Sequence, residues 1–286
     1  YGTGVNVYLV PKGKFSGFRS PFALKKVNEY GKISRMESRI EWEARLLRKL
    51  SHPNIVGFRG KFRDGHVFQC DSSLMDVLEK RDVDDLGPLP ALSVLMLSYE
   101  AAKGLAYLHS QLILHGDIKS DNVLVDKDLT SAKLCDLGTS LLMNEKMEAI
   151  GPEAEYIGSL PWSPPEALEQ RLKSKKDVTI TDRADIYAFG MLIYEMCTLS
   201  VPHANEDTTL EVSSTDISNH SDTLAEERFY ERLGKRPPLF EGQLDDTYNQ
   251  ALEIFHVCSE QVSSDRPSAQ EIVELLRDCL PYTPDD

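Results

Sequence analysis

The stretch Ile113-Leu-His-Gly-Asp-Ile-Lys-Ser-Asp-Asn-Val-Leu-Val125 decides how the rest of the 286-residue chain is interpreted. Apolar residues flank a polar cluster, which predicts a loop held at both ends by short buried strands. Asp117, Lys119 and Asn122 are close enough in sequence to project into one small volume. A carboxylate can orient and deprotonate a hydroxyl, an ammonium can meet a moving phosphate, and an amide oxygen can bind magnesium. This set of groups suits phosphoryl transfer.

A second carboxylate lies in Cys135-Asp-Leu-Gly138, just after another apolar run. With this segment in place, the chain starts to resemble the protein kinase family. The segment 115–122 is similar to the catalytic loop of that family, and Asp136-Leu-Gly138 is similar to its metal-binding triplet.

The composition is that of a globular protein with an acidic excess of 46 acidic over 32 basic residues, a formal charge of -14. So negative a surface argues against nucleic acid or anionic membrane as partners, since both need positive counter-charge. The five cysteines are well separated and show no metal-ligand spacing. We therefore expect reduced thiols in an intracellular protein of the cytoplasm or nucleus. We recognise no signal peptide and no apolar run near the roughly 18 residues that span a bilayer.

The first ten residues combine two glycines, Gly2 and Gly4, with an alternating strand pattern at 5–9. Such a turn lets backbone amides approach phosphates, although a plain hairpin has the same pattern. By resemblance, Gly2 is the second glycine of the kinase glycine-rich loop, and Val5 occupies the position of the third. The first glycine of the pattern would precede residue 1, so most of the first strand would be missing.

Residues 22–27 read as a strand, and its Ala23-Leu-Lys25 resembles the Ala-x-Lys motif that carries the phosphate-binding lysine. A helical pattern follows over about 34–50. Glu43 lies ten residues before Pro53, where a kinase places the glutamate that pairs with this lysine. Glu41 is the alternative, on another side of the helix.

Several further segments have the order and spacing of the same family. A strand at 67–71 and a helix from Ser73 would enclose the adenine-binding hinge, whose residues the short connection does not identify. Helical patterns cover 89–110, 182–197, 248–258 and 268–280, and residues 136–166 correspond to the activation segment. Residues 203–228 are acidic and rich in Ser and Thr, which predicts a long mobile insertion.

The resemblance runs essentially from end to end and implies an α+β, bilobal protein kinase fold. We expect one catalytic domain over 1–286, with a small β-rich N-lobe at about 1–70 and a larger, mostly helical C-lobe at about 71–286. Segments at 4–9, 115–120, 156–158 and 198–203 are most similar to a group of kinases related to the MAP kinase kinases. That group implies serine/threonine or dual specificity and a role in mitotic signalling.

The resemblance assigns roles for ATP and Mg²⁺ as cofactors and a protein as substrate. Lys25 contacts the α- and β-phosphates, and Glu43 holds this lysine in place. Asp117 accepts or orients the substrate hydroxyl, while Lys119 steadies the γ-phosphate. The resemblance also implies which residues surround the nucleotide: Asp136 and Asn122 bind magnesium, Gly2 and Gly4 lie over the phosphates, and Val7, Ala23 and Leu124 contact the adenine.

The same resemblance implies two contacts that hold the C-lobe together. Glu166 and Arg266 form an ion pair that anchors the activation segment. Asp185 holds the catalytic loop through its backbone. Both are structural roles and need no contact with the nucleotide.

One departure from the family pattern concerns regulation. Gly116 replaces the arginine that in many kinases receives an activation-segment phosphate. We therefore predict a weak dependence on such a phosphate, with Thr139, Ser140, Tyr156 and Ser159 as candidate sites.

Two other functions stay open on the sequence alone. A His-Gly-Asp loop also occurs in kinases that phosphorylate aminoglycosides or choline, but Pro164-Pro-Glu166 and Arg266 favour a platform for a peptide substrate. A non-catalytic scaffold is the second alternative, suggested by the incomplete glycine loop and short hinge. Neither oligomeric state nor physiological substrate follows from the residues, although a MAP kinase is one candidate substrate.

Overall fold

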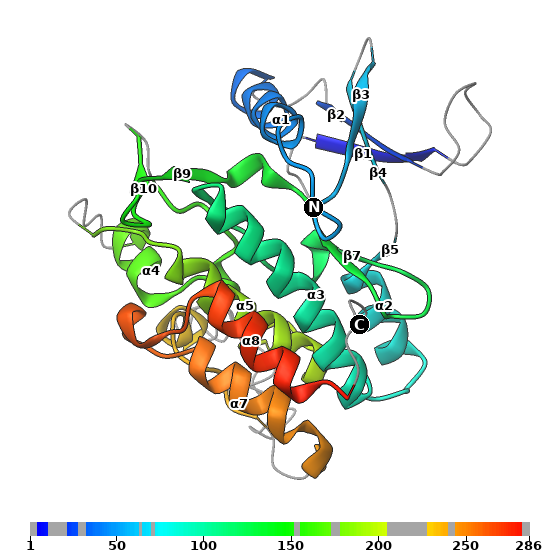
Figure 1. Ribbon diagram of the computed structural model, residues 1–286, viewed down its shortest axis with the longest axis vertical. Coiled ribbons are helices and arrows are strands. Elements are labelled where there is room, and N and C mark those ends of the chain that lie inside the picture. Colours follow the sequence, from blue (N-terminus) through cyan, green and yellow to red (C-terminus); the bar gives the residue numbers. More distant parts are fainter. Residues whose placement is uncertain are drawn as a thin grey trace, which may run out of the picture.

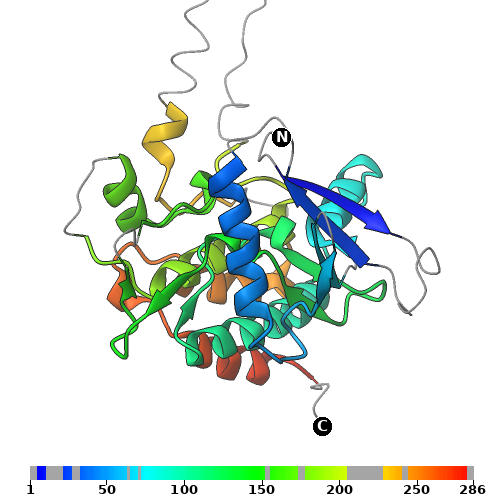
Figure 2. The same cartoon turned by 90° about the horizontal axis from the view of Figure 1, so that it is seen from above.

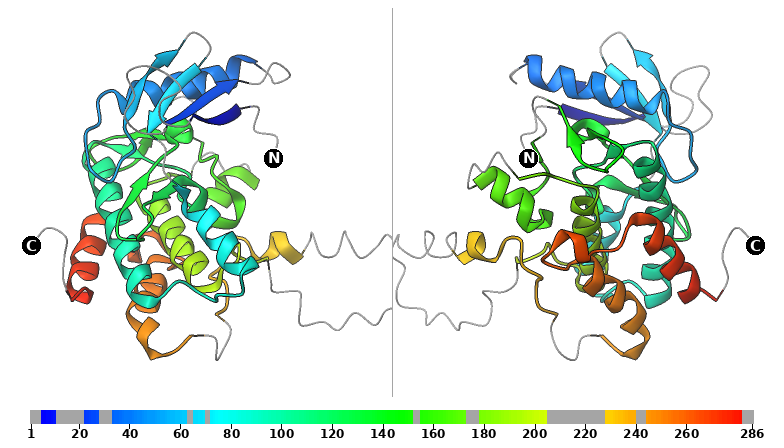
Figure 3. Two further views of the ribbon diagram at one scale, coloured as in Figure 1. Left: turned by 90° about the vertical axis from the view of Figure 1, so that its right-hand side faces the viewer. Right: turned by 60° about the vertical axis from the view of Figure 1, so that its left-hand side comes forward.

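A small lobe with an antiparallel sheet lies on a larger helical lobe (Figure 1; Figure 3). The computed structural model describes residues 5–10, 22–27, 33–62, 65–69, 72–151, 155–172, 178–204, 228–239 and 244–281. In the described part of the chain, the small-lobe sheet has the strand order β1-β2-β4-β3. Its strands are β1 (Val5–Val10), β2 (Phe22–Val27), β3 (Phe58–Phe62) and β4 (Gly65–Gln69). An α+β bilobal kinase fold, as the sequence predicts, is confirmed.

Helix α1 (Ile33–Leu47) lies beside this sheet and contacts β2 (Figure 2). Ile40, Ala44 and Leu47 recur at helical spacing, and all three are buried. Glu43 is a buried charged residue on this helix, at 1% exposure. The helix therefore carries an ionisable group to the border between the lobes.

The large lobe is built around helices α3 (Ala91–Ser110) and α5 (Arg183–Thr198). Every residue of α5 from 184 to 197 is buried, which makes it the centre of the lobe. Helix α8 (Ala269–Cys279) packs against α3, and α7 (Asn249–Cys258) packs against α5. Residues 228–232 are also helical. One continuous apolar cluster joins these helices to the end of α1.

Two short sheets hold the polar stretch 115–122. β6 (Ile113–Leu114) precedes it and pairs with β9 (Leu141–Met143), which in turn pairs with β10 (Ala149–Ile150). β7 (Val123–Val125) follows it and pairs with β5 (Ser72–Ser73) and β8 (Ala132–Leu134). Both flanking strands are largely buried, so the prediction of a loop between two buried strands is confirmed.

The remaining elements are short and mostly begin at recognisable caps. Helix α2 (Leu74–Val83) begins after Ser73, whose side chain forms a reciprocal capping box with Asp76. The other short elements are η1 (Ser120–Asn122), η2 (Leu137–Thr139), η3 (Leu160–Trp162), α4 (Pro165–Leu172), η4 (Asp246–Tyr248) and η5 (Ser263–Asp265).

Two expectations fall largely on residues that the structure does not describe. The hinge includes 70–71 and the proposed insertion includes 205–227, and both lie outside the described ranges. None of the helices in the described ranges combines the length and the apolar character that a membrane crossing requires.

Candidate active site

An ion cluster joins the two lobes. The Lys25 Nζ on β2 lies 3.0 Å from both carboxylate oxygens of Glu43 on α1. The same Nζ lies 3.2 Å from Oδ1 of Asp136, which directly follows β8 and Cys135. The pairing of Lys25 with Glu43 that the sequence predicts is therefore present, while Glu41 is exposed.

The two carboxylates of this cluster stabilise the charge of Lys25 between them. Burial alone would lower the pKa of Lys25, but Glu43 and Asp136 outweigh it and hold that pKa above its ordinary value. Burial would likewise raise the pKa of Asp136, but Lys25 and the backbone N–H of Gly138 lower it overall. Lys25 is thus a cation and Asp136 an anion at neutral pH. Burial raises the pKa of Glu43 to about 7, although Lys25 opposes this shift.

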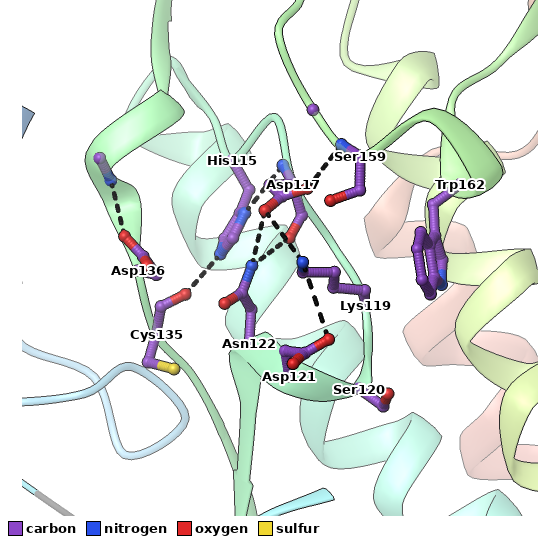
Figure 4. A network of polar contacts seen from close by, with 12 residues as sticks. His115, Asp117, Lys119, Ser120, Asp121, Asn122, Cys135, Asp136, Ser159 and Trp162 are labelled. Atoms are coloured by element: carbon purple, nitrogen blue, oxygen red, sulfur yellow. Dashed lines mark hydrogen bonds and ion pairs between the residues drawn. The ribbon is translucent and has the colours of Figure 1, made fainter. Parts of the chain in front are cut away.

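The catalytic loop brings three of the predicted groups together (Figure 4). Asn122 donates from its amide nitrogen to the backbone carbonyl of Asp117 at 2.7 Å and to Oδ2 of Asp117 at 3.0 Å. Lys119 Nζ lies 3.8 Å from the same Oδ2. The backbone N–H of Ser159, in the activation segment, donates to Oδ1 at 2.8 Å. The Asp117 carboxylate is oriented by all three neighbours and remains 18% exposed.

His115 and Asp185 fix the backbone of this loop. Asp185 on α5 accepts the backbone N–H groups of His115 and Gly116, each at 2.8 Å, and lies 2.9 Å from the His109 ring. The expected structural role of Asp185 is confirmed by these bonds. The ring of His115 donates from Nε2 to the Cys135 carbonyl at 3.0 Å, because a carbonyl can only accept. Its Nδ1 accepts the backbone N–H of Asp117 at 3.3 Å.

Glu195 on α5 is a buried carboxylate that the sequence analysis did not identify. It accepts the backbone N–H and the hydroxyl of Ser120 at 3.0 and 2.5 Å, and the indole N–H of Trp162 at 2.8 Å. Burial raises the pKa of Glu195 to about 7. A charged residue inside an apolar helix was the signal that sequence reasoning could have used.

Asp136 and Asn122 have the chemistry to hold magnesium. Mg²⁺ prefers a few protein oxygens and takes its other ligands from phosphates and water. Because the amide nitrogen of Asn122 faces Asp117, its amide oxygen is the atom that can ligate a cation. The Asp136 side chain is 49% exposed and so can reach a ligand. In the described ranges no cluster of three His, Cys, Asp or Glu side chains forms a metal site built from protein groups alone.

The predicted nucleotide-contacting residues are described to different extents. Gly2 and Gly4 lie outside the described residues. The backbone of Val7 pairs with that of Lys25 between β1 and β2, and Ala23 lies on β2 opposite Leu9. Leu124 lies on β7, half-buried against the apolar cluster. This arrangement places the backbones of Val7 and Ala23 in the sheet that carries the ion cluster.

The activation segment is held to the large lobe at its C-terminal end. The backbone N–H of Tyr156 donates to Gln170 at 2.9 Å, and Arg171 donates to the carbonyl of Gly158 at 3.0 Å. Arg266 forms a paired contact with Glu166, with bonds of 2.6 and 2.9 Å. The ion pair between Glu166 and Arg266 that the sequence predicts is thus confirmed.

The family follows from comparison with known proteins. The protein kinase domain model matches residues 3–276, and the chain belongs to the protein kinase family. Members of this family are enzymes that use ATP and Mg²⁺.

The individual relatives refine this assignment. The chain is 41% identical over 291 residues to the human lymphokine-activated killer T-cell-originated protein kinase, a match covering 96% of this chain and 87% of the relative. The segments 4–9, 115–120, 156–158 and 198–203 predict a likeness to this relative, and the comparison confirms it. Two Arabidopsis thaliana proteins are each 30% identical to the chain. The leucine-rich repeat receptor-like protein kinase PXC2 matches 90% of the chain and 25% of its own length, and the serine/threonine/tyrosine-protein kinase HT1 matches 59% and 41%.

Proposed function

We propose that this chain transfers the γ-phosphate of ATP to serine or threonine hydroxyls of protein substrates, with possible acceptance of tyrosine. The observation that carries the proposal is the presence of two sets of charged and polar side chains on the two sides of Cys135 and His115. One set is Lys25, Glu43 and Asp136, and the other is Asp117, Lys119 and Asn122. A phosphoryl transfer site needs little beyond positioned charges, because its transition state spreads negative charge over phosphate oxygens.

The proposed roles follow from where the charges lie. Lys25, held by Glu43, contacts the α- and β-phosphates, and Lys119 steadies the γ-phosphate. Asp117 accepts or orients the substrate hydroxyl, for which its carboxylate is partly exposed. Asp136 and Asn122 hold magnesium, which would neutralise phosphate charge when bound. Gly2 and Gly4 cover the phosphates, and Val7, Ala23 and Leu124 enclose the adenine.

The preference for serine and threonine rests on Lys119, which lies two residues after Asp117. That lysine is the usual mark of serine/threonine kinases within the family resemblance. The resemblance to kinases related to the MAP kinase kinases suggests a MAP kinase as one candidate substrate, and mitotic signalling in the cytoplasm or nucleus as the setting. We further propose that residues 1–286 act as one catalytic domain, with lobes at about 1–70 and 71–286.

The test is transfer of labelled γ-phosphate from Mg-ATP to a generic basic protein and to a catalytically inactive MAP kinase. Phosphoamino-acid analysis identifies the acceptor residue, and Lys25→Met serves as the matched inactive control. We expect phosphoserine or phosphothreonine with the wild-type chain and none with the variant. Phosphotyrosine alone would contradict the proposed specificity. Nucleotide binding without transfer to either protein would favour the scaffold.

A further inference from the structure

Trp42 on α1 makes one directed polar contact with the activation segment. Its indole Nε1 donates to the backbone carbonyl of Ser140 at 3.0 Å, across 98 residues of sequence. Trp42 is half-buried and immediately precedes Glu43, the partner of Lys25. A tryptophan that merely filled space would not need to aim its N–H at a carbonyl.

Two neighbouring residues of α1 hold the two ends of η2. The backbone N–H of Leu137 at the start of η2 lies close enough to Glu43 to lower the pKa of that carboxyl, and Trp42 binds Ser140 at the end of η2. Gly138 lies against Arg39 between them, because a Cβ built there would be 3.7 Å from the Arg39 Cβ. The segment that directly follows Asp136 is therefore bracketed by one turn of α1.

Ser140 carries the connection on to the catalytic loop. Its hydroxyl donates to the backbone carbonyl of His115 at 3.2 Å. His115 in turn accepts the backbone N–H of Asp117 and donates to Cys135, the residue before Asp136. A series of hydrogen bonds thus runs from Trp42 through Ser140 and His115 to the backbone of Asp117 and to the backbone of Cys135, next to Asp136.

We propose that Trp42 is a positioning residue that couples the placement of α1 to the placement of Asp136 and Asp117. The inference rests on the proposed function, because its effect is on phosphoryl transfer. Glu43 alone ties α1 to Lys25 and to the start of η2, but it leaves the end of η2 free to move. The hydrogen bond from Trp42 fixes the end of η2. The positions of Lys25, Asp136 and the catalytic loop therefore depend on one another.

The decisive variant is Trp42→Phe, which removes the N–H and keeps an aromatic ring. We expect kcat to fall about fivefold, the size expected for the loss of one net hydrogen bond. We also expect the Mg²⁺ concentration for half-maximal ATP binding to rise, because Asp136 is less well placed. ATP binding measured by calorimetry without Mg²⁺, and the unfolding midpoint, should stay close to wild type.

The matched control is Arg45→Met. The Arg45 guanidinium lies 5.9 Å from the centre of the Trp42 ring, so this variant removes a contact of the ring and keeps the N–H. It should leave both kcat and the Mg²⁺ dependence at wild-type values. Equal losses in Arg45→Met and Trp42→Phe would show that packing of the ring matters instead, and would overturn the proposal.

A double-mutant cycle tests the path itself. Ser140→Ala removes the hydroxyl that reaches His115, and it should lower kcat by a similar factor. If the path runs through Ser140, the double variant loses less than the product of the two single losses. Fully multiplicative losses would overturn the coupling, and so would wild-type behaviour of Trp42→Phe. If Trp42→Phe does not fold, wild-type behaviour of Ser140→Ala overturns it.

The same measurements distinguish a failure of the proposed function from a failure of the proposed coupling. A wild-type chain with no transfer activity would contradict the function, while Mg²⁺-dependent ATP binding would still report on Trp42. A shift of that dependence in Trp42→Phe alone would support the coupling even then, and its absence would overturn the coupling.

Discussion

At the scale of single residues, two glycines let the activation segment touch the catalytic loop. Gly158 packs on the carbonyl of Gly116 and on the ring of Tyr156, and a Cβ built on Gly158 would lie 2.7 Å from that ring. Gly116 itself has φ +79°, a conformation that favours glycine. The next residue, Ser159, donates its backbone N–H to Asp117. The closeness of the two backbones thus sets one of the bonds that orient the catalytic carboxylate.

Gly158→Ala should therefore lower kcat by about tenfold or more, because the methyl group displaces Ser159 from Asp117. Steady-state kinetics measures this loss, and the KM for ATP should change little. Gly87→Ala is the control, since a methyl group added there has no atom within 4 Å, and the strain from the positive φ of Gly87 (+65°) arises away from the site. Full activity in Gly158→Ala would show that this close approach is not needed.

Glu195 supplies a pH dependence that can be isolated. Its pKa is raised by burial from 4.5 to about 7. A raised carboxyl pKa means that the folded state holds the proton more tightly than the unfolded state. The stability that this group contributes is therefore complete below about pH 4.5 and is lost as the pH rises through about 7.

Glu195→Gln should remove this dependence and keep the hydrogen bonds. A glutamine can accept from Trp162 and the backbone of Ser120 with its oxygen and donate to the Ser120 hydroxyl. Urea unfolding at several pH values compares the two chains. The free energy of unfolding of wild type should fall, relative to Glu195→Gln, between about pH 4.5 and 7 and stay level above that. Parallel curves would contradict the raised pKa of Glu195.

At the scale of elements, the activation segment is tied down without a phosphate. Trp42 binds its start, and Gln170 and Arg171 bind its end. Gly116 occupies the position where many kinases have a phosphate-binding arginine, and its backbone N–H donates to Asp185. The side chain of Tyr156, one of the candidate phosphorylation sites, is buried at 2% exposure. Hydrogen bonds of the chain therefore hold the segment where many kinases use a charge.

Treatment with a phosphatase should leave the activity of the purified chain unchanged. Mass spectrometry of the treated and untreated samples confirms that phosphate was removed and should find none on Tyr156. Transfer rates before and after treatment give the result. Complete loss of activity on dephosphorylation would refute the account of a segment held without phosphate.

At the scale of the whole molecule, Arg266 connects distant parts of the large lobe. Its side chain is fully buried and binds Glu166 at the start of α4. It also donates to the backbone carbonyls of Glu260 and Arg183. Four separate segments of the chain therefore meet at one guanidinium, and its planar set of donors suits this arrangement.

Arg266→Met should destabilise the protein by about 3–5 kcal/mol, because it leaves Glu166 as a poorly compensated charge. Thermal unfolding measures the loss. Arg266→Lys should recover only part of it, since an ammonium cannot pair with both carboxylate oxygens in the same plane. Arg236→Met is the control at a more exposed pair with Glu260, where we expect a much smaller loss. Equal losses at the two arginines would contradict this account.

Much of the fold could be predicted from the sequence because its local patterns are strong. The loop between β6 and β7 was recognisable from apolar residues on either side of a polar cluster. Helix ends were less certain, since caps set them. The helix expected from Leu89 begins at Ala91, with Pro90 at its N-cap, and the helix expected over 34–50 ends at Leu47.

The parts of the site that the sequence did not predict are contacts between segments far apart in the chain. Trp42 and Ser140, or Glu195 and Ser120, meet only after the chain has folded. No local periodicity identifies such partners, because the distance along the chain is 98 residues in one case and 75 in the other. Lys25 and Glu43 were found only because family motifs fixed their positions. The side chains around the adenine depend on packing between the lobes, which a sequence pattern does not describe.

The most direct test of the central claim compares wild type with Asp117→Asn in single-turnover phosphoryl transfer from Mg-ATP. The asparagine keeps the size of the side chain and an acceptor for Ser159, but it cannot take a proton. We predict a loss of at least about a hundredfold in the transfer rate, with unchanged ATP affinity and unfolding midpoint. Equal rates in the two chains would contradict the assignment of Asp117 as the catalytic carboxylate.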